Sequence, residues 1–259
     1  MNLSIWMGVL MAGGALTWSY MRNGGVGSLV TVHGVAIVVG GTFVAMLINS
    51  SFQSIVNALG SLFSLFFPPR MPSPEEIVVE MTRLGRKAQT EGGLLAVQRD
   101  SVDFAGGFLH RAITVAISAG ESNEIRRILE TEIRQLRIRR QEDSNLFRTM
   151  GTLTPMFGLL GTLLGMIRVL ETLSNPEKVG PAMAVALSSA FLGIALANMV
   201  CIPIAGQIRV FAMNETLLYE MILEGVLDVA SSKPGPIIEM HLLSYARDKA
   251  RPAQNAAGA

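Results

Sequence analysis

The residues best suited to chemistry stand in two apolar stretches in the second half of the chain. Pro155 and Thr162 lie in the first stretch, and Ser188, Ser189 and Pro203 lie in the second. A proline inside a membrane-spanning helix frees a backbone carbonyl, which neighbours, hydroxyls or water then satisfy. Because Thr162 follows Pro155 by two helical turns on the same face, a freed carbonyl and a hydroxyl could together solvate a passing cation.

Neither stretch contains an Asp or Glu at mid-span, so the arrangement lacks a titrating group. Ionisable side chains are costly inside a bilayer and are kept there for a task such as ion binding. We therefore expect another polypeptide to supply the charge. His33, at a membrane edge, is only a faint candidate for proton handling, and Cys201 is interpreted as a buried apolar residue.

The sequence shows no nucleophile paired with a base, no phosphate-binding loop and no cluster of metal ligands. We therefore predict that the chain is not an enzyme and needs no cofactor. The net charge of +1 comes without a basic patch interleaved with aromatic residues, so no nucleic-acid partner is expected.

Composition indicates a membrane protein, because 50% of the 259 residues are hydrophobic, only 16% are charged, and the mean hydropathy is +0.43. Four apolar stretches approach or exceed the roughly 18 to 20 residues that span a hydrocarbon core. No basic segment precedes the first, and no convincing cleavage site follows it, so we expect a retained helix rather than a signal peptide. The predicted spans are 3–21, 29–50, 150–173 and 180–208.

The placement of basic residues predicts the orientation. Of the 21 Lys and Arg residues, 13 lie between Ser51 and Thr149, and five more lie between Arg209 and Arg251. By the positive-inside rule, both segments face the cytoplasm. The prediction is an all-α polytopic protein of the bacterial inner membrane with four spans, both termini in the cytoplasm, and a helical cytoplasmic domain inserted between spans two and three.

The chain therefore divides into four predicted regions: two spans in 1–50, the cytoplasmic domain in 51–149, two spans that hold the ion pathway in 150–208, and a cytoplasmic tail in 209–259. Within the domain, apolar residues of 51–67 recur at helical spacing, which favours a helix lying along the membrane surface. Ser73-Pro74-Glu75-Glu76 is typical of a capped helix start, and that helix should run to about Thr90. From Ser122 onward no breaker appears before Gly151, which predicts one long helix that enters the bilayer as the third span.

Small residues mark one face of each of the last two spans. In the third span, Gly158, Gly161 and Gly165 lie on a narrow arc, and in the fourth, Gly193 follows the serine pair. Such stripes let helix backbones approach closely, and they are more often packing seams than conduits. The two prolines raise the weight of the conduit interpretation.

At this point the residues resemble the MotA, TolQ and ExbB family of ion-channel subunits, and among them the four-span flagellar stator subunits MotA, MotP and PomA. The resemblance covers nearly the whole chain up to about Lys233. It rests on these segments: Thr154-Pro155-Met156-Phe157-Gly158-Leu159-Leu160-Gly161-Thr162, Gly180-Pro181-Ala182-Met183-Ala184-Val185-Ala186-Leu187, Ala197-Asn198-Met199-Val200, Pro203-Ile204-Ala205, Ile37-Val38-Val39-Gly40-Gly41-Thr42 and Gly93-Leu94-Leu95-Ala96.

The resemblance implies a pentamer of this chain around a dimer of a MotB-like subunit, which has a single span, carries the ion-binding Asp and is anchored to peptidoglycan. Such a complex conducts H⁺ or Na⁺ and drives a flagellar rotor switch protein. Pro155, Thr162 and the Ser188–Ser189 region match positions that line the ion path in the family. Pro203 matches a proline linked there to conformational change.

The chain departs from the family pattern at the rotor contact. Stators of this type usually place a basic residue eight positions before a Glu, and here those positions hold Thr90 and Gln98. Arg86, Lys87 and Glu91 lie near enough on a helical face to substitute. The rotor-contact candidates are therefore these three residues and Gln98.

The coupling ion stays open. Sodium-type relatives tend to have an Asp where this chain has Thr31, and two threonines where it has Ser189-Ala190. Thr162 favours the sodium type, although proton-driven members of the family carry a similar Gly-Thr. A sodium ion needs several oxygen ligands, whereas a proton needs a titrating group and a water chain. Taken together, these positions favour neither ion over the other.

Three other interpretations remain. A TolQ- or ExbB-like energiser would power envelope or uptake machinery, although such proteins typically have three spans. A stator of a non-flagellar surface motor would account for the altered rotor-contact positions. A non-conducting scaffold would use Pro155, Thr162 and Pro203 only for packing.

Overall fold

The computed structural model describes residues 14, 31–66, 70–101 and 104–244, and these residues are helical with short connections and no β-strand. The first predicted span, 3–21, lies outside the described residues apart from residue 14. The elements are α2 (Val32–Val35), the π-helix η2 (Ala36–Gly40), α3 (Gly41–Asn49), α4 (Phe52–Phe66), α5 (Pro74–Thr90), α6 (Leu94–Val97), the 3₁₀ turns η3 (Gln98–Ser101) and η4 (Phe104–Gly107), α7 (Phe108–Ala119), α8 (Ser122–Glu171), α9 (Pro176–Leu196), the π-helix η5 (Ala197–Cys201) and α10 (Ile202–Ala230).

Three helical runs of the described residues are long and apolar enough to cross a membrane: Val32–Asn49, Ser122–Glu171 and Pro176–Ala230. The predicted all-α membrane class is therefore confirmed. The predicted long helix is confirmed as well, because α8 runs unbroken from Ser122 through Pro155 to Glu171. The last run differs from the expected span, since helix continues far beyond residue 208 and is interrupted only by the π-helical turn η5.

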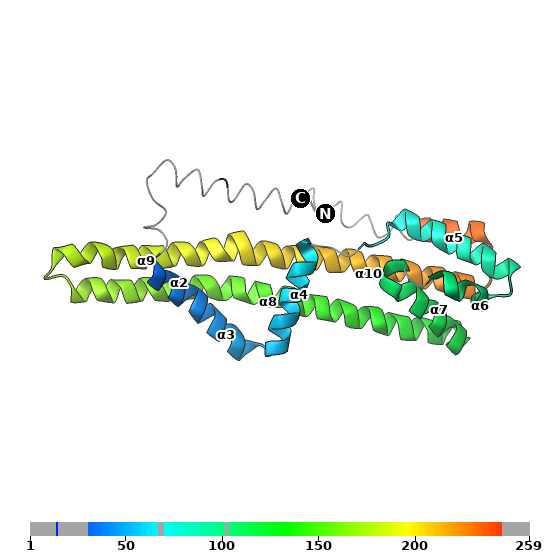
Figure 1. Ribbon diagram of the computed structural model, residues 1–259, viewed down its shortest axis with the longest axis horizontal. Coiled ribbons are helices and arrows are strands. Elements are labelled where there is room, and N and C mark those ends of the chain that lie inside the picture. The colour runs from blue at the N-terminus through cyan, green and yellow to red at the C-terminus, as the bar shows by residue number, and fades with distance from the viewer. Residues whose placement is uncertain (1–13, 15–30, 67–69, 102–103, 245–259) are drawn as a thin grey trace. The chain divides into compact units, whose positions relative to one another are not determined.

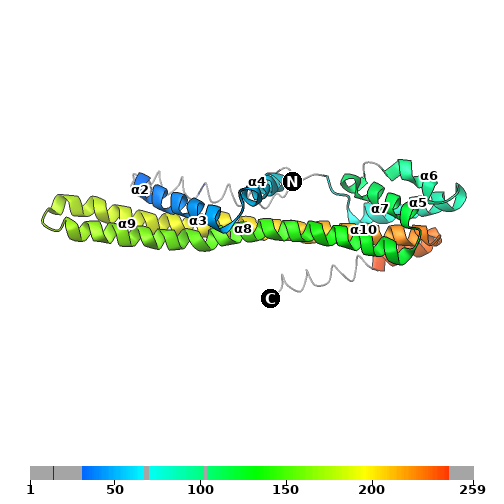
Figure 2. The ribbon, with the colours of Figure 1, turned by 90° about the horizontal axis from the view of Figure 1, so that it is seen from below.

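The chain forms two compact units. Unit 1 holds the described parts of Met1–Pro68 and Arg140–Arg209, and unit 2 holds those of Pro69–Arg139 and Val210–Ala259. In unit 1, the second half of α8 runs beside α9, and α2 and η2 lie against α9 (Figures 1 and 2). Large apolar side chains cover the outside of this pair, with Leu159, Leu163 and Ile194 each more than half exposed. That surface suits lipid or other apolar helices.

Helix α4 crosses α8 within unit 1 at a steep angle (Figure 1). Its inner face is tied to α8, because the Ser61 hydroxyl donates to Asp143 and Arg140 Nη1 donates to Ser61 Oγ at 3.2 Å. Its opposite face exposes a stripe of large apolar side chains at helical spacing: Phe52, Val56, Leu59 and Phe63. An apolar stripe on a helix that crosses the spans agrees with an interfacial helix.

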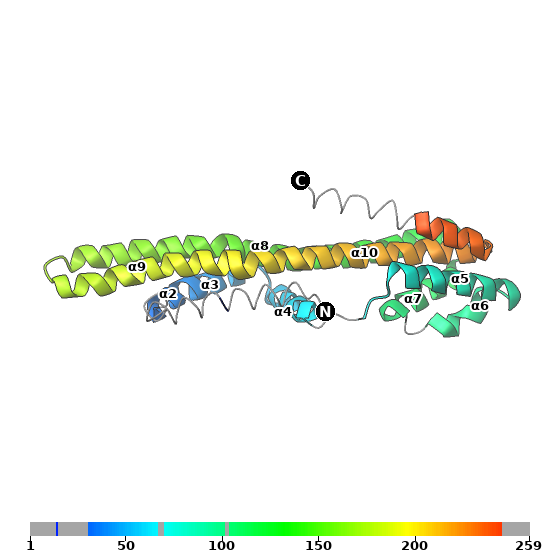
Figure 3. The same cartoon turned by 90° about the horizontal axis from the view of Figure 1, so that it is seen from above.

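Unit 2 is built around a large apolar core. Helices α5 and α7 pack on residues of α8 and α10, with Phe108, Ile77 and Met81 almost fully buried. The ring of Phe108 stacks on Tyr219 at 4.4 Å between centroids. Figure 3 shows α5, α6 and α7 grouped at one side of this region. A core of this kind makes unit 2 a globular helical domain by itself.

The start of α5 shows how local sequence sets an element. Ser73 Oγ accepts from the Glu76 backbone N–H at 3.2 Å, and Glu76 Oε2 accepts from the Ser73 N–H at 3.0 Å. This is the predicted capping box, with Pro74 at the first helical position. The helix ends at Thr90, as expected, before Gly92 and Gly93 adopt φ angles of 96° and 93° that other residues rarely adopt.

Candidate ion-pathway site

Helices α8 and α9 meet along the predicted glycine faces. A Cβ on Gly158 would lie 2.9 Å from the Ser189 carbonyl oxygen, and one on Gly193 would lie 2.9 Å from the Thr154 carbonyl oxygen. Gly165 faces Ala186, where an added Cβ would approach the alanine Cβ to 2.5 Å. No side chain larger than hydrogen fits at these points, so the two backbones are in direct contact.

The two serines of the predicted pathway lie inside this seam. Ser188 and Ser189 are fully buried. The Ser188 Oγ accepts from the Thr31 backbone N–H at 3.0 Å and bonds to the Thr31 hydroxyl at 3.2 Å. Ser189 Oγ donates to the Val185 carbonyl at 2.8 Å, and its side chain lies against Gly161. Both hydroxyls therefore bond within the chain.

Thr31 is a residue whose role sequence reasoning missed. Besides bonding to Ser188, its Oγ1 accepts from the Gly34 backbone N–H at 3.1 Å and caps α2. Gly34 is buried beside both serines, and a Cβ there would lie within 3.2 Å of each Oγ. In the sequence, Thr31 stood out only as the position where sodium-type relatives tend to have an Asp, and its bond to Ser188 could not be foreseen across 157 positions.

Thr162 and Pro155 occupy a different place. Both are half-buried, and Thr162 Oγ1 donates to the Leu159 carbonyl at 2.6 Å, so its lone pairs stay available as acceptors. Pro155 removes the donor of the Gly151 carbonyl, four residues back. Gly151 and Thr162 are separated by about 16 Å of helix rise. One cation cannot contact both groups at once. The Gly151 carbonyl oxygen and Thr162 Oγ1 would therefore have to contact an ion one after the other along the path.

A second helix irregularity lies at η5. The Ile202 N–H donates to the Ala197 carbonyl five residues back, and the next residue, Pro203, has no N–H to donate. The helical hydrogen bonds therefore change from an i−4 to an i−5 acceptor at Ile202, and one hydrogen bond is missing at Pro203. Below the break, Ser144 Oγ donates to the Ala205 carbonyl at 2.9 Å and holds α10 to α8. Pro203 itself is exposed, and nearby Cys201 is buried, as its apolar interpretation expects.

The rotor-contact candidates lie in unit 2. Arg86 is exposed at the end of α5, and Lys87 Nζ lies 3.7 Å from Glu91 Oε2 in a loose ion pair. Gln98 differs because it is half-buried and its Nε2 donates to Thr114 Oγ1 at 3.3 Å. Its backbone carbonyl also bonds to His110 Nδ1 at 3.1 Å. Arg86 and Glu91 are therefore exposed to solvent, Lys87 is half-buried beside Glu91, and Gln98 is turned toward α7.

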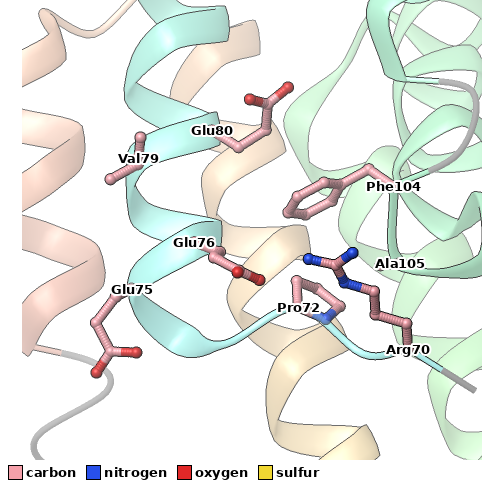
Figure 4. A pocket seen from close by; sticks show the side chains of 8 residues that line it. All are labelled: Arg70, Pro72, Glu75, Glu76, Val79, Glu80, Phe104 and Ala105. Atoms are coloured by element: carbon pink, nitrogen blue, oxygen red, sulfur yellow. The ribbon is translucent and has the colours of Figure 1, made fainter.

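Unit 2 also contains a surface pocket of about 540 Å³ beside the start of α5 (Figure 4). Its lining mixes three glutamates with Arg70, whose guanidinium points between Phe104 and Glu76. Within the described residues, no three His, Cys, Asp or Glu side chains are grouped to hold a metal ion. The pocket offers no arrangement of acid, base and nucleophile.

These features define a multi-pass helical membrane protein in which a close-packed helix pair carries hydroxyls but no acid at mid-span, as in an ion-channel subunit. Residues 101–221 match the MotA/TolQ/ExbB proton channel family, and curated MotA and PomA motility proteins are similar to this chain over most of its length. The family consists of channel and stator subunits and not of enzymes, in agreement with the prediction.

Relatives and solved structures extend the likeness to nearly the full chain. The chemotaxis protein PomA of Vibrio alginolyticus is 26% identical over 97% of this chain and 98% of its own length. The flagellar MotAB stator complex from Bacillus subtilis contains a chain that is 27% identical, with a TM-score of 0.83, covering 96% of this chain and 98% of that one. A chain of C. jejuni MotAB has the same fold, with a TM-score of 0.85 at 20% identity, covering 95% and 96%.

Proposed function

We propose that the protein is the A-subunit of a flagellar motor stator, which with a MotB-like partner conducts H⁺ or Na⁺ and converts ion-motive force into torque. The observation that carries this proposal is the α8–α9 pair, which places Thr162 on a half-exposed face and contains no acid at mid-span. The full-length likeness to the Bacillus subtilis stator chain supports it.

The proposed assembly supplies the acid that the chain lacks at mid-span. In the proposal, five copies surround a dimer of a single-span, peptidoglycan-anchored subunit that supplies the ion-binding Asp. The exposed apolar side chains of α8 and α9, such as Leu163 and Ile194, would pack on neighbouring copies, the partner helices and lipid. The protein would cross the bacterial inner membrane four times, with 51–149 and both termini in the cytoplasm.

The pathway residues then take distinct roles. Thr162 is the hydroxyl best placed to meet an ion at the partner's Asp, because its face is half-exposed. Ser188 and Ser189 would reach the ion only if α9 moved relative to α2 and α8, since both now bond within the seam. Pro155 and the η5–Pro203 break are the irregular points that such a movement would use.

Torque would pass to the rotor switch protein through the end of α5. Arg86, Lys87 and Glu91 would make this contact, which the exposure of Arg86 and Glu91 at the end of α5 supports. Gln98 occupies the position where stators of this type usually have a Glu. Because the Gln98 side chain is turned toward α7, residues of α5 would make the rotor contact instead. This altered surface is the one observation that favours the second candidate, a stator of a non-flagellar surface motor.

The test is co-expression with the MotB-like partner in cells that lack their own stator. Thr162→Ala should abolish or strongly reduce both ion flux and torque, because it removes the exposed acceptor from the pathway. Thr152→Ala is the matched control, since Thr152 lies on the same helix and its hydroxyl donates to its own helix, to Arg148 O at 3.2 Å. Equal flux in wild-type, Thr152→Ala and Thr162→Ala cells would contradict the proposed pathway.

A further inference from the structure

The last described residues fold back onto α5. After α10 ends at Ala230, a turn with Ser232 at φ 56° leads into helix over residues 235–244. Ile238 and Leu242 on this helix are fully buried. A Cβ on Gly85 of α5 would lie 2.5 Å from Ile238 Cδ1, so the two helices touch where α5 has no side chain. We call residues 231–244 the C-terminal clamp.

A buried carboxylate fastens the clamp to α10. Asp228 is 2% exposed, and its two oxygens bond in different directions. Oδ1 lies 2.6 Å from Lys233 Nζ in the turn, and Oδ2 lies 2.6 Å from His241 Nδ1 on the clamp helix. A buried charge is tolerated only when it is paired. Asp228 therefore holds both ends of the clamp at once.

The clamp also reaches the exposed side chains of α5. Gln89 Nε2 donates to the Ser232 carbonyl at 3.1 Å and to the Lys233 carbonyl at 2.9 Å. The Arg86 side chain lies across Gly235, where an added Cβ would be 3.1 Å from Nε and 3.2 Å from Cγ. These two contacts lie at the end of α5, close to Lys87 and Glu91, whereas Ile238 and Leu242 of the clamp belong to the apolar core of unit 2.

We propose that the C-terminal clamp is a positioning element for torque transmission, which fixes the end of α5 so that Arg86, Lys87 and Glu91 present one constant surface to a charged face of the rotor. This inference rests on the proposed stator function. It assigns the clamp no part in ion passage.

The experiment compares two double variants of the full chain, each assembled with the partner subunit. Ile238→Ala with Leu242→Ala removes the buried side of the clamp helix. Met240→Ala with Leu243→Ala removes two exposed apolar side chains from the same helix and is the matched control. For each complex we would measure torque on a tethered load, ion flux, and hydrogen exchange of the α5 amides near residues 86–91.

The first pair should lower torque at least several-fold, leave ion flux unchanged, and speed exchange at the end of α5, whereas the control pair should match wild type. His241→Ala should act in the same direction, and His241→Gln, which keeps a donor for Asp228, should recover most of the torque. Equal loss of flux and torque, or unchanged torque and exchange, would overturn the positioning role. If the wild-type chain gave neither flux nor torque, the stator proposal would fail, and the exchange data alone would still decide whether the clamp orders α5.

Discussion

Unit 1 and unit 2 differ in where their large apolar side chains lie and in how their buried polar groups are paired. In unit 2, Phe108 and Ile222 are almost fully buried, and the acids Glu224 and Asp228 meet basic partners of the same unit. In unit 1, many large apolar side chains point outward, and buried hydroxyls such as Ser188 bond to neighbouring helices. Unit 2 therefore buries its own apolar core, whereas unit 1 exposes an apolar surface that suits other helices and lipid.

This difference separates two tasks. A self-contained core with paired charges can carry force without changing shape. A helix pair joined through glycines and hydroxyls, with an irregular turn at η5 and a second one at η2 of the neighbouring helix, can rearrange at low cost. We therefore expect substitutions in unit 1 to affect ion passage and assembly, and substitutions on the surface of unit 2 to affect torque alone.

The largest effect should come from closing the glycine seam of unit 1. Gly193→Leu places a side chain where the nearest atoms are the backbone of Thr154, Gly158 and Pro155, so α8 and α9 must separate. We expect loss of the assembled complex from the membrane and of all flux, measured by quantitative purification and ion uptake. Gly180→Leu on the same helix, where no atom lies within 4 Å, is the control and should assemble normally.

A smaller effect, confined to function, should come from reversing charge on unit 2. Arg86→Glu with Lys87→Glu reverses two charges at the end of α5, and should cut torque several-fold while flux stays at the wild-type level. Bead rotation and ion uptake measured on the same cells check this. Unaffected swimming would show that these two residues do not contact the rotor.

Removing one hydroxyl from the unit 1 seam should cost stability. Ser188→Ala leaves the half-buried Thr31 N–H without its acceptor, which should lower stability by about 1 kcal/mol. Thermal unfolding of the detergent-solubilised complex measures the loss. Ser174→Ala, at an exposed turn, is the comparison and should change little. Equal melting temperatures for the two variants would mean that the Thr31–Ser188 bond contributes nothing.

The smallest effect is expected at an ion pair of unit 2. Arg126 donates two hydrogen bonds to the Glu224 carboxylate, at 2.6 and 3.0 Å, which raise the pKa of Arg126, while partial burial lowers it. Because the Arg126 side chain is 43% exposed, Arg126→Ala should cost no more than about 1 kcal/mol, and less at high salt. Urea unfolding at two salt concentrations checks this, with the more exposed Arg127→Ala as reference.

Local signals in the sequence were enough for several elements. The Ser73 capping box, the end of α5 at Thr90 and the unbroken α8 follow from residues within a few positions of each other, and the structure has all three. The glycine arc of α8 also faces α9, because small residues at helical spacing leave no alternative to close packing.

Features that depend on distant contacts could not be predicted. The Thr31–Ser188 bond joins residues far apart in sequence, and the π-helical turns at η2 and η5 have no local composition that marks them. The clamp was expected only as part of a tail, because the role of Asp228 depends on His241, which reaches it through the turn at Ser232. Gln98 was predicted to contact the rotor, but its side chain bonds to Thr114 of α7, a contact that the sequence does not reveal.

The most direct test of the account is ion flux through the purified chain in vesicles, alone, with its MotB-like partner, and with a partner whose membrane Asp is replaced by Asn. We predict flux only in the second case, because the apolar stretches of α8 and α9 that carry the hydroxyls contain no acid at mid-span. Conduction by the chain alone, or undiminished conduction with the Asn partner, would contradict the claim that the charge comes from another polypeptide.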